Sequence, residues 1–592
     1  MGLEDFTEFD EDTSAQENTV DESTGEVRFE TTDVTTQDSY SGLGVVSVSR
    51  GLKIDETGDD TNLQVYITAP NRSRIRIGSY VLVPYPDNER LFCRISGLEY
   101  AQEFHSDDAT EINARRAMQT DNIDETDYKF IAELDPVAVL YEQDGELKRR
   151  MTDRVPKPKT VVREATDKGE IKTGLKIPDD GIFIGHLAVG GERITTAAEP
   201  PTIDYRLKDK YDDGDPLIFR HTLVAGGTGS GKTHVAKNIL RQVLDQSRSY
   251  PLSDGRERKP AVVQFDPQDE YAQMHDDNDQ ITKEDQRRWE REDIAYGGYD
   301  NTIAFVPKIK GTTYDTKGHR AEQRRFTIPF SMVRQNQWLV AGGDLNNNQY
   351  QAIRLLLKRF FDQFGNSGTY AQFKQFLEDP ALREELSESG KVHESTYDAV
   401  VRRIQGFENV FDQDAQPITD QIDEFVRQGR LSVVPTYHLN DSRAAETIVL
   451  AVASLLVDEK LSSNPRYEQV KDTPLVVGMD EAHNYLTDAD SVQARKVIRK
   501  FTEAAKQGRK ERLGLFLITQ DPQDIHEAVF KQINTTIVLN LGDEDAISSV
   551  NIPTELEGKV PYMEQGQMVV YSPDNSEPVE LVGLPKCLTQ HK

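Results

Sequence analysis

The sequence of 592 residues contains few cysteines, no long apolar run and less positive than negative charge. Its two cysteines, Cys93 and Cys587, are too few and too far apart for a disulfide scaffold, a zinc cluster or a cysteine-bound iron site. No stretch approaches the roughly 18 apolar residues that cross a bilayer. The first residues, MGLEDFTEFDEDTS, lack the basic and apolar regions of a signal peptide. We therefore expect a cytoplasmic protein with no membrane partner.

The charge is strongly negative but unevenly distributed. The chain has 70 Lys and Arg against 102 Asp and Glu, a formal net charge of −32. Residues 1–40 contain thirteen acidic residues and one basic residue in a stretch poor in apolar side chains, which predicts a disordered tail. The remaining residues carry −20, so local basic patches are still possible. Net charge alone does not decide between a nucleic-acid partner and another kind of partner.

The first part of the chain has the pattern of a small β domain. Short apolar runs alternate with turn residues over residues 41–150, for example LQVYITA and RIRIGSYVLVPYP, which predicts a small β-barrel or sandwich. Residues 151–214 are rich in Pro and Lys near their start, and we interpret them as a linker or strap leading to the next domain.

From about Leu217, apolar runs of four to six residues alternate with helical patterns. Near-continuous apolar strands are typical of a parallel sheet covered by helices on both faces, so the fold class is α/β. We assign this core to residues 215–345 and 431–545, with a helical insertion at 346–430 and a β or extended segment at 546–592. The predicted strands lie in the runs HTLVAG (221–226), AVVQFDP (261–267), LSVVPTYHL (431–439), PLVVGMDEAH (474–483), LGLFLITQ (513–520) and TTIVLNL (535–541).

One motif has a clear chemical meaning. The segment GGTGSGKT matches G-x-x-x-x-G-K-[ST], and it lies directly between a predicted strand and a predicted helix. Its glycines allow successive backbone N–H groups to surround phosphate oxygens, and the helix N-terminus adds partial positive charge. The lysine reaches the β- and γ-phosphates, and the threonine hydroxyl ligates Mg²⁺. The sequence thus predicts an ATP and Mg²⁺ site at Gly226, Gly227, Thr228, Gly229, Ser230, Gly231, Lys232, Thr233 and His234.

Acidic and amide residues follow other predicted strands. Asp480 and Glu481 end the strand PLVVGM, where the first would hold Mg²⁺ and the second would polarise the attacking water. Gln520 ends the strand LGLFLIT and is a candidate sensor of the γ-phosphate; a turn residue fits the position equally well. Asp266 and Glu270 could approach the same metal, although a solvated acidic turn is an equal alternative. The pair Asp480 and Glu481 indicates hydrolysis rather than binding alone.

In this order, the P-loop GGTGSGKTH, the turn DPQDEY, the strand MDEAHNYL, the segment GRKERLGLFLITQDP and the strand NTTIVLNL resemble the HerA family of DNA translocases, relatives of the FtsK DNA pumps. The resemblance spans about residues 42–585. It implies an N-terminal barrel, a RecA-like ATPase core with an inserted helical bundle, and a homohexameric ring that pumps double-stranded DNA without sequence specificity. It also implies a NurA-like nuclease as a partner in end resection.

The resemblance also assigns roles to individual residues. Lys232 and Thr233 match the Walker A pair, Glu481 matches the catalytic glutamate, and Gln520 matches a glutamine at a strand end. Arg509 resembles an arginine that acts on the nucleotide of a neighbouring subunit. One departure is Asp521, where the family more often has a basic residue, and a second is the acidic segment 1–40.

Two basic stretches are candidates for contact with DNA phosphates. Residues 308–325 contain six Lys or Arg against two acids, and residues 495–512 contain eight against two. A solvated helix face or a salt-bridged subunit interface is an equal alternative for each stretch. His438 and His483 lie at predicted strand ends, but no spacing typical of a transition-metal site occurs, and we interpret both as structural. Mg²⁺ is the only metal that the sequence predicts.

The leading hypothesis is a hexameric ATP-driven translocase or helicase on double-stranded DNA. A second hypothesis is an ATPase ring that assembles and activates a bound effector, such as a nuclease or an antiviral enzyme. A conjugative DNA pump is disfavoured by the lack of a membrane segment. An ATPase that acts on protein is compatible with the motifs alone, since only the family resemblance indicates DNA.

Overall fold

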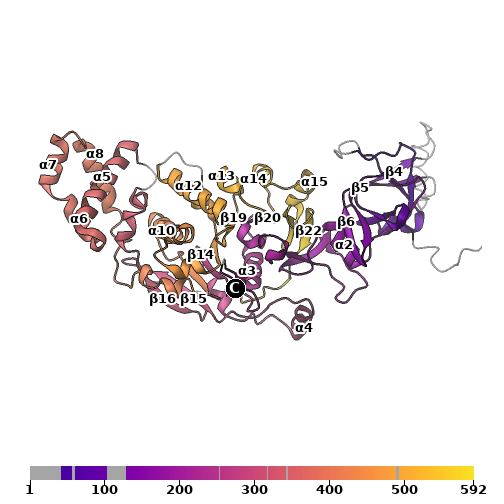
Figure 1. Cartoon of the computed structure of the whole chain (residues 1–592), viewed down its shortest axis with the longest axis horizontal. Coiled ribbons are helices and arrows are strands. Elements are labelled where there is room, and N and C mark those ends of the chain that lie inside the picture. The colour runs from indigo at the N-terminus through magenta and orange to yellow at the C-terminus, as the bar shows by residue number, and fades with distance from the viewer. Residues whose placement is uncertain are drawn as a thin grey trace, which may run out of the picture. The chain divides into compact units, whose positions relative to one another are not determined.

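The computed structural model describes residues 42–55, 61–102, 128–252, 254–316, 318–341, 345–487 and 492–592 (Figure 1). The described helices and strands all belong to one compact unit, Leu43–Lys592. The predicted acidic tail at residues 1–40 lies outside the described residues. Within the described ranges, no helix has both the length and the apolar character of a membrane span.

The N-terminal part is a closed β-barrel, as predicted. Six antiparallel strands pair in the cyclic order β2-β1-β7-β3-β4-β5 and back to β2, with β6 on the outer edge of β5. Alternate residues point inward, so Val65, Leu91 and Val139 are buried in one apolar cluster. The strands are β1 (Gly44–Ser47), β2 (Gln64–Ile67), β3 (Tyr80–Pro84), β4 (Arg90–Gln102), β5 (Tyr128–Gln143), β6 (Glu146–Arg150) and β7 (Val161–Glu164).

A large mixed sheet forms the rest of the core. Eight parallel strands run in the order β20-β11-β19-β18-β14-β17-β15-β16, and each predicted strand run lies in this set. The strands are β11 (Thr222–Ala225), β14 (Ala261–Asp266), β15 (Thr302–Pro307), β16 (Glu322–Phe326), β17 (Leu431–Pro435), β18 (Leu475–Met479), β19 (Leu513–Thr519) and β20 (Thr535–Val538).

The sequence predicts a parallel sheet in the core, and the observed sheet continues past β20 with antiparallel strands. Where the sequence predicts a linker at residues 151–214, the structure has barrel strand β7, helix α2 (Lys168–Leu175) and three strands of this extension. One of these three strands pairs with a strand near the C-terminal end of the chain, and local patterns do not reveal such distant pairing. The extension contains β8 (Ile182–Val189), β9 (Glu192–Arg193), β10 (Asp204–Leu207), β21 (Gln567–Tyr571) and β22 (Val579–Val582).

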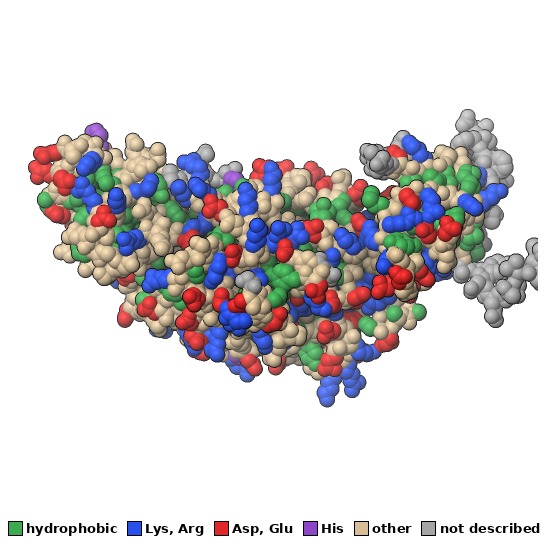
Figure 2. All heavy atoms as spheres, viewed as in Figure 1, with side chains coloured by type: hydrophobic (Ala, Val, Ile, Leu, Met, Phe, Trp, Pro, Cys, Tyr) green, Lys and Arg blue, Asp and Glu red, His purple; other side chains and the backbone are tan. Residues whose placement is uncertain are grey.

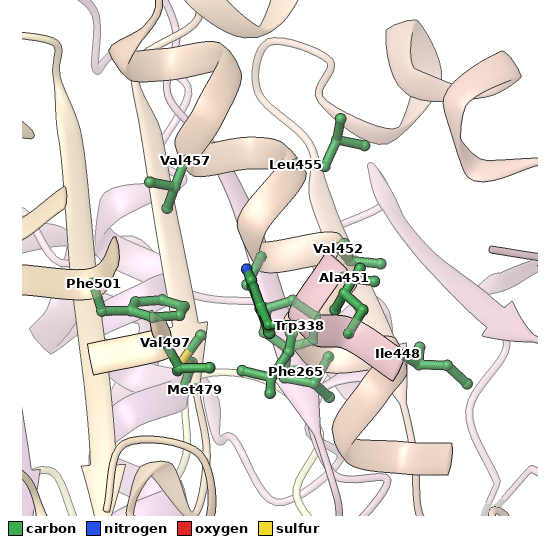
Figure 3. Packing of buried hydrophobic residues seen from close by; sticks show 14 of the residues in the cluster. Phe265, Trp338, Ile448, Ala451, Val452, Leu455, Val457, Met479, Val497 and Phe501 are labelled. Atoms are coloured by element: carbon green, nitrogen blue, oxygen red, sulfur yellow. The ribbon is translucent and has the colours of Figure 1, made fainter. Parts of the chain in front are cut away.

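The parallel strands are buried on both faces because their alternate residues enter two separate apolar clusters. In β11, Leu223 and Ala225 pack into one cluster while Val224 packs into the other. The first cluster also contains helices α10 (Ser442–Leu461) and α12 (Val492–Gln507), whose side chains meet around Trp338 (Figure 3). The second cluster contains helix α3 (Lys232–Val243). This two-sided burial explains the near-continuous apolar runs in the sequence.

The predicted helical insertion is confirmed as a group of four helices that lie side by side (Figure 1). They are α5 (Asn347–Phe364), α6 (Tyr370–Leu377), α7 (Pro380–Glu388) and α8 (Glu394–Gln405). Asn346 with Gln349 and Thr369 with Gln372 form capping boxes that define where α5 and α6 begin. The remaining helices are α4 (Lys283–Arg291), α9 (Ile422–Phe425), α11 (Glu468–Asp472), α13 (Glu527–Phe530), α14 (Glu544–Ser549) and α15 (Thr554–Glu557).

His221, immediately before β11, is a buried histidine whose neutral form is required by its two contacts. The Leu515 N–H donates to its Nδ1 at 3.0 Å, and its Nε2 lies 2.7 Å from the Ala505 carbonyl oxygen. A ring nitrogen that accepts cannot carry a proton, so Nε2 is the donor. Burial lowers the pKa of His221 to about 4. The histidine thereby joins β11, α12 and β19 only while it is uncharged.

We expect His221 to make stability depend on pH. As the pH falls from 6.5 toward 4, the unfolded chain binds a proton that the folded chain does not, so the free energy of unfolding should fall by up to about 3 kcal/mol. In His221→Gln, an amide that keeps a donor and an acceptor without titrating, this loss should be absent. Urea-unfolding midpoints of both proteins at pH 7.5 and pH 4.5 test the expectation. An equal drop in both proteins would contradict it.

Candidate functional site

The loop between β11 and α3 forms a cradle of backbone N–H groups. β11 ends at Ala225 and α3 begins at Lys232, so the chain turns within the glycine-rich segment. Gly229 and Gly231 have φ values of 79° and 101°, which residues with side chains rarely adopt. The N-terminus of α3 points at the same loop and favours negative charge. The cradle is suited to the phosphate groups of a nucleotide.

Lys232 lies inside this cradle. Its Nζ donates a hydrogen bond to the Gly227 carbonyl oxygen at 3.0 Å, and the residue is only 8% exposed. Burial lowers the pKa of Lys232, while the nearby carboxylates of Glu481 and Asp480 act in the opposite direction. Thr233 follows in the first turn of α3 and is half-buried. An ammonium group and a hydroxyl therefore lie at the mouth of the phosphate cradle.

Asp480 and Glu481 follow β18 at the sheet edge that carries the cradle. β18 pairs with β19, and β19 pairs with β11, all in parallel, so their carboxyl ends lie together. Asp480 is buried, and burial together with the charges of Asp266 and Glu481 raises its pKa to about 8. Glu481 has a left-handed backbone conformation, with φ 51° and ψ 49°. Such a concentration of buried carboxylates favours a bound cation.

A hydrogen-bond relay joins the cradle to Glu481 through Gln520. The Thr228 hydroxyl donates to Gln520 Oε1 at 2.7 Å, and Gln520 Nε2 donates to Glu481 Oε1 at 2.5 Å. The other oxygen, Glu481 Oε2, is buried and has no hydrogen-bond partner in the described structure. A buried, unsatisfied carboxylate oxygen is costly. It is therefore suited to accept a proton from a water molecule held between the carboxylate and a phosphate.

Asp266 and Glu270 lie near these carboxylates, as their effect on the pKa of Asp480 indicates. Asp266 follows β14's apolar residues, is fully buried and accepts the N–H groups of Gln268 and Tyr271 at 3.2 and 2.8 Å. Burial raises its pKa to about 6. The segment is thus not a fully solvated acidic turn, although Glu270 itself is half-exposed.

The oxygen donors fit Mg²⁺ better than a metal held by protein groups alone. Among the described residues, no group of three or more His, Cys, Asp or Glu side chains is arranged to hold an ion. Mg²⁺ is usually bound by one or two protein oxygens together with water and substrate phosphates. The Thr233 hydroxyl and the Asp480 carboxylate provide such oxygens beside the cradle. They are the residues of this chain that would hold the ion.

Asp521, the departure from the family pattern, faces His483. Asp521 Oδ2 lies 3.7 Å from His483 Nε2, and His483 Nδ1 lies 3.0 Å from Thr519 Oγ1 and 3.5 Å from Glu481 Oε2. His483 lies at a strand end near the site, as the sequence predicts, and its ring contacts Glu481 of the relay as well as Thr519 and Asp521. The sequence signal for this position was its place two residues after Glu481.

Asn540 is a further residue at the site that the sequence analysis missed. Its carbonyl oxygen accepts the Gly227 N–H at 2.6 Å, and its side-chain amide donates to the carbonyl oxygens of Pro561 and Met563 at 3.1 and 2.7 Å. Asn540 thus fixes the cradle to the loop before β21. A polar residue just after β20, the neighbour of β11, was the available signal.

His234 and Lys237 connect α3 to the C-terminal segment. The His234 ring lies 5.7 Å from the ring of His591, and burial lowers the pKa of His234 to about 4. Lys237 is fully buried and donates to the carbonyl oxygens of Glu270 and Gln590 at 3.1 and 2.5 Å. The His234 side chain therefore faces the C-terminal segment, so any contact with a nucleotide would involve its backbone.

Arg509 does not join this cluster. It lies between α12 and β19, at the amino end of β19, whereas the cradle lies at the carboxyl end of the neighbouring strand β11. Its Nε pairs with Asp215 Oδ2 at 3.1 Å, and both side chains are partly exposed. Arg509 and the cradle of the same chain therefore lie at different edges of the sheet. The predicted contact of Arg509 with a nucleotide would have to be made at the cradle of a neighbouring subunit.

Both basic stretches are partly neutralised by ion pairs within the chain. In residues 308–325, Arg320 pairs with Asp276, and Arg324 pairs with Glu322 and Glu424; residue 317 lies outside the described part. In residues 495–512, Lys500 pairs with Asp458, while Lys496 is exposed. Figure 2 shows acidic and basic side chains interspersed over the visible face.

His438 lies 3.3 Å from the Pro307 carbonyl oxygen and is buried.

The fold and the site together define a RecA-like P-loop ATPase core. The strand that carries the cradle lies between β19 and β20, and the acidic strand β18 lies directly beyond β19. The cradle, the buried carboxylates and the strand-end glutamine all lie on the same edge of the parallel sheet.

Residues 210–456 match the family model described as the central domain of the helicase HerA, which confirms the resemblance to the HerA family. A probable helicase of Methanocaldococcus jannaschii is 21% identical over 365 residues, which cover 60% of this chain and 64% of that protein, slightly less than two thirds of its length. The DNA double-strand break repair helicase HerA of Sulfolobus acidocaldarius is 18% identical over 521 residues, covering 85% and 87% of the two chains. The plasmid coupling protein TrwB in complex with ADP and Mg²⁺ is similar in structure, with a TM-score of 0.43 and 13% identity over 69% of this chain and 97% of that one.

Proposed function

We propose that this HerA-type ATPase hydrolyses ATP with Mg²⁺ and uses the energy to move double-stranded DNA without sequence specificity. The observation that carries the hydrolytic part is the relay from Thr228 through Gln520 to Glu481, whose second oxygen is buried and accepts no hydrogen bond in the described structure. The DNA part is supported by the similarity to the Sulfolobus acidocaldarius protein, which is a DNA double-strand break repair helicase. We propose that the protein acts in the cytoplasm.

In the proposed reaction, ATP binds with its phosphates in the cradle of residues 226–231. Lys232 would leave the Gly227 carbonyl oxygen and contact the β- and γ-phosphates, and Thr233 and Asp480 would hold the Mg²⁺ ion. The ion, when bound, neutralises phosphate charge and orients the γ-phosphate. The Gln520 amide already connects the cradle to the Glu481 carboxylate by hydrogen bonds. Binding of a γ-phosphate in the cradle would therefore affect Glu481 through Gln520.

Glu481 would accept a proton from the attacking water through Oε2. The water oxygen then forms a bond to the γ-phosphorus while the bond between that phosphorus and the β–γ bridging oxygen breaks, leaving ADP and phosphate. Arg509 of a neighbouring subunit would stabilise the charge that develops on the phosphate, which couples hydrolysis to assembly. A homohexameric ring is the assembly that we propose, with a NurA-like nuclease or another effector as its partner in DNA end resection.

The test is steady-state ATPase activity with and without linear duplex DNA, at moderate and at high salt. We expect several-fold stimulation by DNA that weakens at high salt, because phosphate contacts release counterions. Lys232→Ala should abolish both basal and stimulated activity. An ATPase rate that is unchanged by DNA at both salt concentrations would refute the proposed movement of DNA. It would favour the second hypothesis, an ATPase ring that activates a bound effector.

A further inference from the structure

A polar groove lies against α12, and none of the residues that line it belongs to the hydrolytic site. Its volume is about 640 Å³, and we refer to it as the α12 groove. Five basic side chains line it, and they come from three separate parts of the fold. They are Arg354 of α5, Arg466 of the turn after α10, and Lys496, Arg499 and Lys500 of α12.

The carboxylates of the groove are already engaged by other groups. Asp458 accepts Lys500 Nζ at 2.7 Å, and Glu503 pairs with Arg499 at 3.1 Å. Glu459 accepts the backbone N–H groups of Arg466 and Tyr467 at 2.7 and 2.9 Å. Within the described residues, Arg354, Arg466 and Lys496 have no carboxylate partner, and all three are exposed. The groove therefore carries excess positive charge on a chain whose net charge is −32.

The floor of the groove is closely packed. Trp338 belongs to the same buried apolar cluster as side chains of α10 and α12, among them Val497 and Phe501 (Figure 3). Lys500 Nζ lies 6.0 Å from the centre of the Trp338 ring and donates to Asn336 Oδ1 at 2.8 Å. Asn336 in turn donates to Asp458 at 3.2 Å. The helix that carries three of the basic side chains, α12, is thus held by close packing. These side chains should therefore lose less conformational entropy when they bind a ligand.

We propose that the α12 groove binds phosphate groups of the DNA backbone, an inference that rests on the proposed function. Arg and Lys on several elements, together with amide side chains such as Gln335 and Asn464, are typical donors to phosphate and sugar oxygens. The two aromatic residues that line the groove, Trp338 and Tyr350, are each only 5% exposed, so no aromatic face is open for a base to stack on. The lack of an exposed aromatic face favours a polynucleotide backbone, rather than a free nucleotide, as the ligand. It also favours binding without sequence preference.

The test compares the full chain with a variant in which Arg354, Arg466 and Lys496 are all changed to Gln. Binding to a linear 30-base-pair duplex is measured by fluorescence anisotropy over a series of salt concentrations. If all three side chains contact phosphates, the slope of log K against log salt should decrease in magnitude by about 2.7, and affinity at moderate salt should fall roughly tenfold or more. ATPase activity without DNA should be unchanged, because none of the three residues lies in the nucleotide site.

The matched control changes Lys358, Lys391 and Arg402 to Gln, which removes the same charge from exposed positions of the helical insertion. It should keep the wild-type affinity and slope. Equal losses in both variants, or no loss in the groove variant while the wild type binds duplex, would overturn the groove assignment and leave the proposed function standing. A wild type that binds no duplex would instead refute the proposed function.

Two further measurements distinguish other occupants of the groove. Light scattering should give the groove variant the same oligomeric mass as the wild type; a smaller mass would assign the groove to subunit contact and overturn the proposal. Binding of inorganic tripolyphosphate by calorimetry should be the same in both proteins. A loss of tripolyphosphate binding with unchanged duplex binding would assign the groove to a small anion and overturn the proposal as well.

Discussion

Replacing Glu481 by Gln should reduce the rate of ATP hydrolysis by about 10²- to 10⁴-fold while nucleotide binding persists. The amide has nearly the shape of the carboxylate and can still accept the Gln520 N–H, so the relay of Thr228, Gln520 and residue 481 should survive. What the substitution removes is the ability of Oε2, which is buried and accepts no hydrogen bond from the described residues, to take a proton from water. The loss should therefore appear in kcat rather than in affinity.

Glu527→Gln is the matched control, since Glu527 is an exposed glutamate that pairs with Lys531 on a helix surface. It should leave hydrolysis unchanged. Single-turnover hydrolysis and equilibrium binding of a fluorescent ATP analogue measure the two quantities separately. Near-normal turnover in Glu481→Gln would show that another group activates the water, and Asp266 would then be the first candidate because it is buried beside Asp480.

Replacing Lys232 by Ala should weaken ATP binding by roughly 10²- to 10³-fold, since truncating one partner of a buried charge pair costs about 2–5 kcal/mol. The Lys232 ammonium is held in the cradle by the Gly227 carbonyl oxygen, only 8% exposed and close to the carboxylates of Glu481 and Asp480. Without it, the triphosphate would face those carboxylates with no opposing charge from α3. Hydrolysis should be lost as well.

Lys531→Ala is the corresponding control, because it removes an exposed lysine from the same surface pair as Glu527. Its ATP affinity should equal that of the wild type. Titration with the fluorescent analogue gives both constants, and circular dichroism checks that each variant is folded. If Lys232→Ala bound ATP with unchanged affinity, the cradle would not be the nucleotide site and the whole proposed mechanism would fail.

The two variants also separate binding from chemistry in the DNA experiment. Glu481→Gln keeps ATP bound without turnover, so it should hold any DNA-bound state that ATP stabilises, whereas Lys232→Ala should not reach that state. The affinity of the two variants for duplex DNA, compared in the presence of ATP and Mg²⁺, would therefore show whether nucleotide binding alone changes the affinity for DNA.

The chemistry of the site was predictable because each of its main groups lies at a strand end. The spacing of the P-loop, the acidic pair after PLVVGM and Gln520 after LGLFLIT are local features, and parallel pairing brings such strand ends to one edge. The near-continuous apolar runs also indicated a buried sheet, and the helical periodicity of residues 346–430 indicated the insertion. These properties depend on neighbours in the sequence, so the sequence by itself determined them.

Other features depend on contacts between residues far apart in the chain, and only the tertiary structure decided them. The antiparallel extension pairs β8 with β22, Asn540 braces the cradle through the Gly227 N–H, and His483 turns toward Asp521. The α12 groove likewise combines Arg354, Arg466 and Lys496, which no local pattern groups together. Long-range pairing and the charge left after ion pairing are properties of the packed chain, which is why periodicity and motif spacing could not reveal them.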